Sequence, residues 1–311
     1  MRTYTKITDI TKEYPRTAVA LGMFDGMHIG HQSIVRRAME LAREQGGTGV
    51  VFTFNNHPLS VLAKDQMPLQ IGTPELRSSI LEEMGVEVLF NIPFTEEFSR
   101  LSPERFLELL RERLAPGYVV TGANFTFGYQ GAGDKEFLQQ HGADYGFRAE
   151  VCPTVQVGGR PVSSTRIREL IRDGNLDAVN EFLGRPFAFA GRVARGDRRG
   201  RTLGFPTANL QIPDGRAMLP NGAYAVQAIH GETCYNGLAN IGDNPTFDGC
   251  NRRLEVNLQD FHKDIYGQLL QVVFLKKLRD ERKFPSAEHL VRQLHRDKEA
   301  ASRVWEDYAI L

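Results

Sequence analysis

The sequence predicts an α/β chain in two parts: a parallel sheet covered by helices, then an antiparallel β domain with a C-terminal helix. Three observations support this. Apolar strands alternate with helices up to about residue 185, only strand-like segments follow as far as residue 276, and the final segment has helical periodicity. With 311 residues the chain is about twice the usual domain length. We therefore expect two domains, 1–185 and 186–311.

The elements of the first part follow from apolar runs and their boundaries. Near-continuous apolar strands followed by helices are typical of a parallel sheet with both faces covered. The first helix is indicated by Ile34, Val35, Ala38 and Leu41 at helical spacing, and Gly46 ends it. We expect strands at 18–21, 49–54, 86–92, 118–122 and 147–152, and helices at 31–45, 74–84, 103–114, 165–172 and 176–183.

The second part consists of strand-like segments separated by turn clusters such as 213–215 and 243–245. This arrangement is typical of an antiparallel barrel or sandwich. The expected strands are 187–195, 222–230, 233–240, 252–259 and 268–275. The C-terminal helix is expected to pack on the β domain through one stripe, made of Leu290, Leu294, Ala301, Val304, Trp305 and Tyr308.

The composition excludes a disordered, collagen-like or coiled-coil chain, with 41% hydrophobic and 24% charged residues. Basic and acidic residues number 38 each, without the basic excess of a protein that follows nucleic-acid phosphates. Between Arg192 and Arg201, however, five arginines accompany a single aspartate. Balanced totals with one basic cluster favour a small polyanionic ligand, and no nucleic-acid partner is expected.

The cysteines and the N-terminal segment indicate the compartment. Cys152, Cys234 and Cys250 cannot all pair and form no CxxC spacing, which favours a reducing compartment without a zinc site. The first residues contain no apolar targeting core, and no apolar run approaches the roughly 18 residues of a membrane span. We expect a soluble, cytoplasmic protein without a membrane partner. The oligomeric state is left open.

The segment 22–31, Gly-Met-Phe-Asp-Gly-Met-His-Ile-Gly-His, lies where the first strand meets the first helix. Ligands bind at the carboxyl ends of such strands. Gly22, Gly26 and Gly30 permit close backbone approach, and His28 and His31 add two imidazoles at the positive end of the helix dipole. This combination suits a polyphosphate. The alternative is a Gly-rich turn with two surface histidines, which the strand–turn–helix context disfavours.

A second loop, 162–168, opens a helix with hydroxyl residues and supplies two arginines. Ser164 or Thr165 would serve as a simple helix cap on its own. With Arg168 one turn further, the loop also forms an anion-binding helix start. Beside the two histidines, we favour the second interpretation.

These residues resemble the signature of the HxGH nucleotidyltransferase superfamily. With segments 53–58 and 122–128, the pattern is similar to the adenylyltransferase half of the prokaryotic bifunctional riboflavin kinase/FAD synthetase family, which joins FMN to the AMP of ATP. The resemblance implies a Rossmann-like fold, with the ATP phosphates held by His28, His31, Ser164, Thr165 and Arg168. It also implies ATP-site residues Gly22, Phe24, Asp25, Gly30 and Asn124, and flavin-site residues Phe54, His57, Pro58, Phe125 and Phe127.

Two positions depart from the pattern of that family. Asn56 stands where proline is common, and Asn124 stands where many members have aspartate. Neither change removes a phosphate-binding group, so the departures bear on flavin-side detail rather than on activity.

A third candidate site is segment 196–209, Gly-Asp-Arg-Arg-Gly-Arg-Thr-Leu-Gly-Phe-Pro-Thr-Ala-Asn. The chain contains no Gly-Lys dipeptide and hence no P-loop, so a kinase here needs another phosphate cradle. Glycines and arginines provide backbone N–H groups and guanidinium forks. Thr207 and Asn209 offer two neutral oxygens of the kind that Mg²⁺ accepts. From spacing alone, a solvated arginine loop followed by a β-turn is the favoured interpretation.

This segment, with 240–247, 254–261, 265–267 and 279–284, resembles the riboflavin kinase domain over nearly all of residues 187–300. The resemblance implies a β-barrel kinase that binds Mg²⁺·ATP through Thr207 and Asn209 as metal ligands, with Glu255 as general base on the ribityl hydroxyl. The implied ATP-binding residues are Gly196, Arg198, Gly200, Arg201, Thr207 and Asn209, and the implied flavin-binding residues are Arg279 and Phe284. Asn257 stands where histidine is frequent, which we take as a tolerated change. A buried structural role is the alternative for Glu255.

The leading hypothesis is a bifunctional enzyme. Riboflavin and ATP would give FMN, and FMN and a second ATP would give FAD and pyrophosphate. One alternative is that only one half is active, which the motifs in both halves disfavour. Another is a flavin-sensing or RNA-binding regulator on the same folds, which predicts loss of Glu255 or of the histidines; the sequence retains them.

Overall fold

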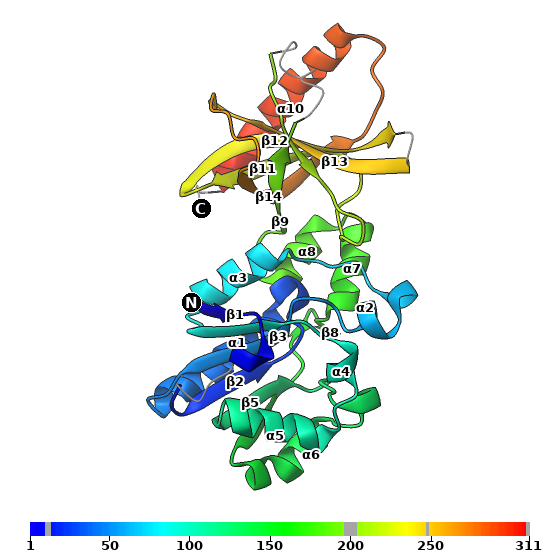
Figure 1. The fold of residues 1–311 in the computed structure, drawn as a ribbon. Helices are drawn as coiled ribbons and strands as arrows, with labels where there is room; N and C mark the ends of the chain where they lie inside the picture. The colour runs from blue at the N-terminus through cyan, green and yellow to red at the C-terminus, as the bar shows by residue number, and fades with distance from the viewer. Residues whose placement is uncertain (10–13, 196–203, 247–248, 309–311) are drawn as a thin grey trace. The chain divides into compact units, whose positions relative to one another are not determined.

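The structure is a computed structural model that describes residues 1–9, 14–195, 204–246 and 249–308. The chain divides into two compact units, residues 1–68 with 77–164 and residues 69–76 with 165–311 (Figure 1). Residues 165–185 therefore group with the second unit by packing. The predicted boundary between functional domains, at residues 185 and 186, concerns which residues each activity needs, and it remains a prediction.

The first unit contains a six-stranded parallel sheet in the order β1-β4-β3-β2-β5-β6. From β2 the chain adds β3 and β4 on one side, and then β5 and β6 on the other. A parallel sheet binds ligands where its strand order reverses in this way, here between β2 and β5. The strands are β1 (Arg2–Tyr4), β2 (Thr17–Leu21), β3 (Gly49–Phe54), β4 (Val88–Ile92), β5 (Pro116–Gly122) and β6 (Arg148–Cys152).

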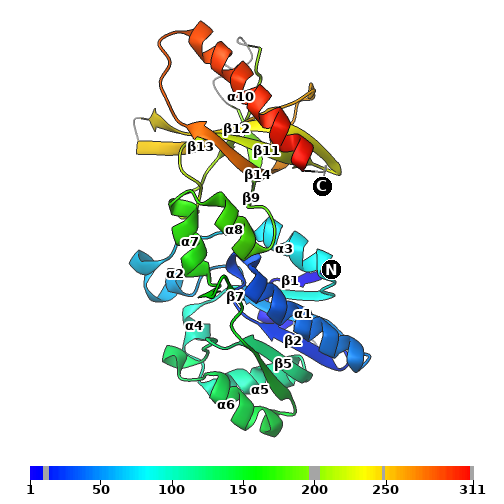
Figure 2. The ribbon, with the colours of Figure 1, turned by 180° about the vertical axis from the view of Figure 1, so that it is seen from behind.

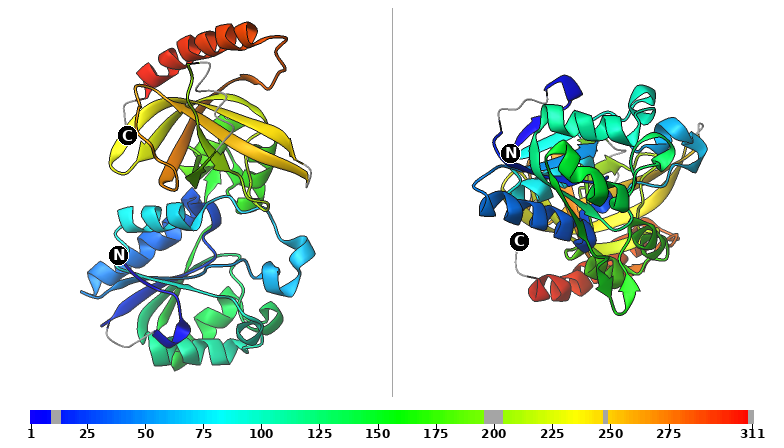
Figure 3. Two further views of the ribbon diagram at one scale, coloured as in Figure 1. Left: turned by 45° about the horizontal axis from the view of Figure 1, so that its top comes forward. Right: turned by 90° about the horizontal axis from the view of Figure 1, so that it is seen from below.

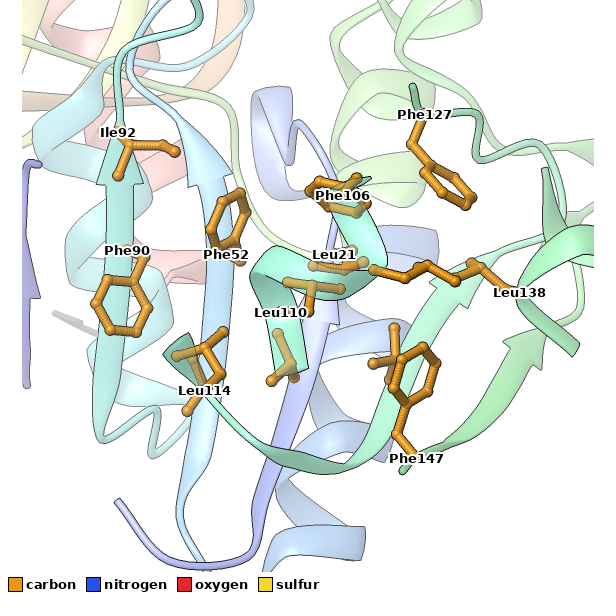
Figure 4. Close-up of a cluster of buried hydrophobic side chains, with 14 of the residues drawn as sticks. Leu21, Phe52, Phe90, Ile92, Phe106, Leu110, Leu114, Phe127, Leu138 and Phe147 are labelled. Carbon is orange, nitrogen blue, oxygen red and sulfur yellow. The ribbon is translucent and has the colours of Figure 1, made fainter. Parts of the chain in front are cut away.

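Helices cover both faces of this sheet, as expected from the apolar strands. All five residues of β2 are buried. The helix α1 packs on β2, β3 and β5 (Figure 2). On one face, α5 and α6 contribute Phe106, Leu110 and Leu138 to a core with Leu21 and Phe52 (Figure 4). The helices of this unit are α1 (Ile29–Glu44), α2 (Leu59–Leu62), α3 (Pro74–Glu83), α4 (Glu96–Ser99), α5 (Pro103–Arg113) and α6 (Lys135–His141).

The second unit contains a closed six-stranded barrel in the order β10-β13-β12-β11-β14-β9, with antiparallel neighbours throughout. The sequence left a barrel and a sandwich open, and because this sheet closes on itself the domain is a barrel. The elements are α7 (Ser164–Arg172), α8 (Leu176–Leu183), β9 (Ala188–Ala194), β10 (Ala208–Gln211), β11 (Gly222–His230), β12 (Thr233–Thr246), β13 (Gly249–Leu258), β14 (Leu269–Asp280) and α10 (Ala287–Asp307).

The C-terminal helix α10 packs on β11, β12 and β14, as predicted (Figure 3). Within the predicted stripe Ala301 and Val304 are buried, and the Trp305 indole N–H donates to the Val226 carbonyl oxygen at 3.1 Å. Tyr308 is 38% exposed, so its place in the buried stripe was wrong. Asp297 is buried instead, because an ion pair compensates its charge.

Several short elements were not predicted. The strands β1 and β10 contain 3 and 4 residues, too few for a clear apolar pattern. The hairpin β7 (Gln156–Val157) and β8 (Arg160–Pro161) turns through Gly158 and Gly159, whose φ angles of 55° and 72° suit a two-residue type I′ turn. In the part of the chain that is described, no helix combines the length and the apolarity that crossing a membrane requires.

One buried tyrosine gives the barrel a testable pH dependence. The Tyr224 hydroxyl donates to the Pro220 carbonyl oxygen at 2.6 Å, and burial raises the pKa of Tyr224 to about 12. An unfolded tyrosine has a pKa of about 10, so the unfolded chain loses this proton first as the pH rises. We expect the free energy of unfolding to fall by about 2 kcal/mol more in the wild type than in Tyr224→Phe between pH 10 and 12. Urea denaturation across this range measures the difference, and identical pH profiles would contradict it.

Two candidate active sites

The loop between β2 and α1 holds its two histidines in a defined arrangement. His28 is the N-cap of α1, and its Nδ1 accepts a hydrogen bond from the backbone N–H of His31 at 3.1 Å. The two rings stack with centroids 3.6 Å apart, and His28 is only 6% exposed. This places paired imidazoles at the helix N-terminus, where the dipole favours an anion. The predicted pairing of the histidines at a helix start is therefore present.

The glycines of this loop permit the close approach that the sequence suggested. Phe24 adopts a left-handed conformation with φ 52°, which is uncommon for a bulky residue and folds its ring back over the loop. A Cβ on Gly22 would lie 3.0 Å from that ring, and one on Gly30 would lie 3.2 Å from the His28 ring. A side chain at either position would therefore require the neighbouring ring to shift by a few tenths of an ångström.

The second predicted loop meets the first through its serine. The Ser164 hydroxyl donates to the Asp25 carbonyl oxygen at 3.1 Å, although the two residues are far apart in the sequence. Thr165 and Arg168 belong to the second unit, where Arg168 Nε donates to the Leu69 carbonyl oxygen at 2.5 Å. The structure thus brings Ser164 to the first site; the roles of Thr165 and Arg168 there stay predictions.

A cavity of about 410 Å³ opens beside the histidine loop at the carboxyl ends of the strands. Eight of the residues that the sequence analysis assigned to ATP or flavin line it: Gly22, Phe24, His31, Phe54, Pro58, Asn124, Phe125 and Phe127. Aromatic walls of this kind suit a flat, largely apolar ring system. His57 does not line the cavity; its Nδ1 accepts from the backbone N–H of Leu59 at 3.1 Å, close to the start of α2.

Sequence analysis missed part of this wall. Phe94 and Phe98 also line the cavity, and the ring centroid of each lies 5.1 Å from that of Phe54. Both residues lie in the segment that follows β4, and this position beyond the carboxyl end of a parallel strand could have indicated them from the sequence. Asn56, one of the two departures from the family pattern, holds Phe94 through its side-chain amide: its Oδ1 accepts from the Phe94 N–H at 2.7 Å and its Nδ2 donates to the Phe94 carbonyl at 3.0 Å.

In the barrel, strand register assembles the predicted residues into one row. Asn209 on β10 lies directly opposite Glu255 on β13, which lies opposite Asn240 on β12. The row continues through Ala223 on β11 to Arg279 on β14. Directly opposite residues in antiparallel strands project to the same face. Asn209, Glu255 and Arg279 therefore share one face of the barrel.

Arg279 is held at its end of the row by α10. Its guanidinium pairs with the buried Asp297 carboxylate at 2.9 Å and lies 5.6 Å from the centroid of the Phe284 ring. The two residues predicted to flank the flavin are thus in contact with each other. The sequence analysis did not identify Asp297, because its ion pair joins α10 to Arg279 on a strand distant in the sequence. Its position as an acidic residue on the apolar stripe of the helix could have indicated it.

A cavity of about 640 Å³ adjoins the row. It is lined by Val193, Val256, Leu258, residues 206–208 and residues 261–266. Thr207 is thus part of its wall. Asn209 and Glu255 alternate with the wall residues Ala208 and Val256 along their strands and so project from the opposite face. The predicted phosphate-loop residues Gly196, Arg198, Gly200 and Arg201 lie outside the described residues.

Comparisons with known proteins give the family. Residues 10–166 match the model of FAD synthetase and residues 183–305 match that of riboflavin kinase. The chain is 37% identical over 299 residues to the bifunctional riboflavin kinase/FMN adenylyltransferase of Bacillus subtilis, covering 94% of each protein. It is 38% identical over 283 residues to the protein of the same name from Escherichia coli K12, covering 90% of each. The chain belongs to the bifunctional riboflavin kinase/FMN adenylyltransferase family.

A solved structure has the same fold. A structure described as a macrolide-efflux protein from Streptococcus pneumoniae superposes with a TM-score of 0.83 at 36% identity, covering 96% of this chain and 98% of that one. The family resemblance stated from the motifs is thus confirmed, as is the order of a parallel α/β part followed by a barrel with a C-terminal helix. The catalytic and binding roles of the individual residues in this riboflavin kinase/FMN adenylyltransferase family member remain predictions.

Proposed function

We propose that this chain makes FAD from riboflavin in two steps. In the first, riboflavin takes the γ-phosphoryl group of ATP at the barrel, giving FMN and ADP. In the second, a phosphate oxygen of FMN attacks the α-phosphorus of another ATP in the first unit, giving FAD and pyrophosphate. The observation that carries the proposal is that one chain matches both family models, each over the segments that contain the corresponding site.

For the kinase step we propose Glu255 as the general base. Its place directly opposite Asn209 puts a carboxylate beside the segment that would hold ATP. The carboxylate would accept the proton of the ribityl hydroxyl as that oxygen bonds to the γ-phosphorus and the bond to the ADP oxygen breaks. Arg279 and Phe284 would bind the flavin on the face of the barrel that Glu255 and Asn209 share.

For the adenylyl transfer we propose that His28 and His31, with Ser164, Thr165 and Arg168, hold the phosphates of ATP. The helix N-terminus adds backbone N–H groups that stabilise the charge developing on the departing pyrophosphate. The aromatic cavity would hold the ring of FMN, with Phe54, Pro58, Phe125 and Phe127 in its walls. No covalent intermediate with the protein is needed in either step.

The donor set near Glu255 fits Mg²⁺. Asn209 Nδ2 donates to the Thr207 carbonyl oxygen at 3.3 Å, which orients the amide so that its oxygen serves as an acceptor. The Thr207 hydroxyl and the Asn209 amide are neutral oxygen donors, which Mg²⁺ accepts when substrate phosphates complete its shell. When bound, Mg²⁺ would neutralise charge on the phosphate oxygens.

This assignment predicts a metal requirement. We expect excess chelator to stop both reactions, since each moves a polyanion that the side chains only partly neutralise. Thr207→Ala and Asn209→Ala should raise the Mg²⁺ concentration that gives half-maximal FMN formation, with FAD formation from FMN little changed. Gln211→Ala, an exposed amide on the same strand, is the matched control. Undiminished FMN formation in excess chelator would contradict the metal ligands.

The remaining features are proposed on chemical grounds. We propose residues 1–185 and 186–311 as the two functional domains and the cytoplasm as the location, because both steps consume ATP and the three cysteines of the sequence cannot all pair. The balanced charge favours small-molecule partners, riboflavin, FMN and ATP, over nucleic acid. Separate assays of the two steps test whether only one activity is present.

A further inference from the structure

Arg77 on α3 lies outside every motif found in the sequence, yet its guanidinium reaches three groups at the edge of the aromatic cavity. Its Nη1 donates to the Met23 carbonyl oxygen at 3.1 Å. Its Nη2 donates to the Phe54 carbonyl oxygen at 3.1 Å and to Asn91 Oδ1 at 2.8 Å. Met23 and Phe54 both line the cavity. One side chain thus ties the loop after β2 to the carboxyl ends of β3 and β4.

The two carbonyl groups belong to Met23 and Phe54, both of which line the cavity. Met23 precedes Phe24, whose left-handed conformation folds its ring onto the loop. The Met23 carbonyl also accepts from the Thr53 hydroxyl at 3.2 Å, and Thr53 is the register partner of Asn91. The acceptors around Arg77 therefore form one connected network. A planar guanidinium with donors in a fixed fork can hold several acceptors at set positions, which a single ammonium cannot do.

We propose that Arg77 is a positioning residue for the adenylyl transfer: it fixes the backbone of Met23 and Phe54, and with it the Phe54 ring that would enclose the flavin of FMN. This inference rests on the proposed function of the first unit. It assigns Arg77 no contact with substrate. Its effect should therefore appear in the binding of FMN rather than in the chemical step.

The test is a steady-state comparison of Arg77→Met with the wild-type full chain, below the unfolding temperature of each protein. Methionine keeps an unbranched side chain but removes all the donors. We expect KM for FMN in FAD formation to rise at least about tenfold, because small displacements of positioning groups cost that much or more. KM for ATP should change by less than about twofold, and kcat should change less than KM for FMN. Arg77→Lys, which keeps the charge and part of the donor set, should be intermediate.

Arg37→Met is the matched control. Arg37 is another partly exposed arginine of the first unit, and it pairs with Glu40, Glu44 and Glu150 away from the cavity. Its loss should lower the unfolding temperature without changing KM for FMN. Riboflavin phosphorylation by each variant reports on the integrity of the rest of the chain.

A second experiment uses Asn91→Leu to test whether Asn91 and Arg77 act together. Residues in one hydrogen-bond network give non-additive effects, so the Arg77→Met, Asn91→Leu double variant should raise KM for FMN by less than the product of the two single effects. If Arg77→Met loses stability but keeps the wild-type KM for FMN, Arg77 is structural only and the inference is wrong. If the wild type makes no FAD from FMN and ATP, the proposed function fails and this inference fails with it.

Discussion

Replacing Glu255 by glutamine is expected to slow riboflavin phosphorylation by about 10²- to 10⁴-fold, the usual contribution of a general base. Glutamine keeps the size and much of the hydrogen bonding of the side chain but cannot take the proton of the ribityl hydroxyl. FAD formation from supplied FMN should stay within about twofold of wild type, because effects at sites without shared partners are nearly independent. Chromatography of the flavins after incubation with ATP and Mg²⁺ measures both rates.

The matched control for Glu255 is Glu232→Gln in the turn between β11 and β12, where the side chain is exposed. It should leave both reactions unchanged. Two outcomes would contradict the assignment. One is a folded Glu255→Gln protein that makes FMN at the wild-type rate. The other is a folded variant that also fails to make FAD from FMN, since Glu255 would then act on the whole chain rather than on one reaction.

Substitution of the stacked histidines should have the opposite effect, with FMN accumulating and FAD not appearing. We expect His28→Asn and His31→Ala to slow FAD formation by about 10²- to 10³-fold, the range seen when one stabilising donor is removed. Asparagine is chosen at His28 because that residue is the N-cap of α1, and an asparagine side chain accepts the same kind of backbone hydrogen bond. The variant thus keeps the helix start and removes the imidazole.

His141→Ala is the control for both histidines, because His141 lies at the end of α6, outside the histidine loop, with its side chain 44% exposed. Thermal unfolding separates loss of catalysis from loss of fold, and riboflavin phosphorylation should persist in every variant. A folded His28→Asn protein that makes FAD at the wild-type rate would show that this imidazole serves only as a cap.

The sequence predicted the long elements because their signals are local. Apolar strands such as Gly49–Phe54 and periodic helices such as Ile29–Glu44 bury residues that repeat at fixed spacing. The strand β10 has only 4 residues and was not predicted, although the residues at its start were assigned to the site. Helix α10 was predicted, but the exposure of Tyr308 and the burial of Asp297 depend on partners outside the helix.

The candidate sites divide in the same way. The histidine loop was predictable because its residues lie next to one another at a strand-to-helix junction. The row from Asn209 through Glu255 to Arg279 depends on pairing register between strands far apart in the sequence, which no local pattern reveals. The contacts of Arg77 with Met23, Phe54 and Asn91 likewise arise only when three strands and a helix are assembled.

The central claim is that one chain converts riboflavin to FAD. The most direct measurement is to incubate the purified protein with riboflavin, ATP and Mg²⁺ and to follow the flavins by chromatography over time. We expect FMN to appear first and FAD to follow, with pyrophosphate released in step with FAD. A preparation that is folded and still yields no FMN and no FAD would contradict the account.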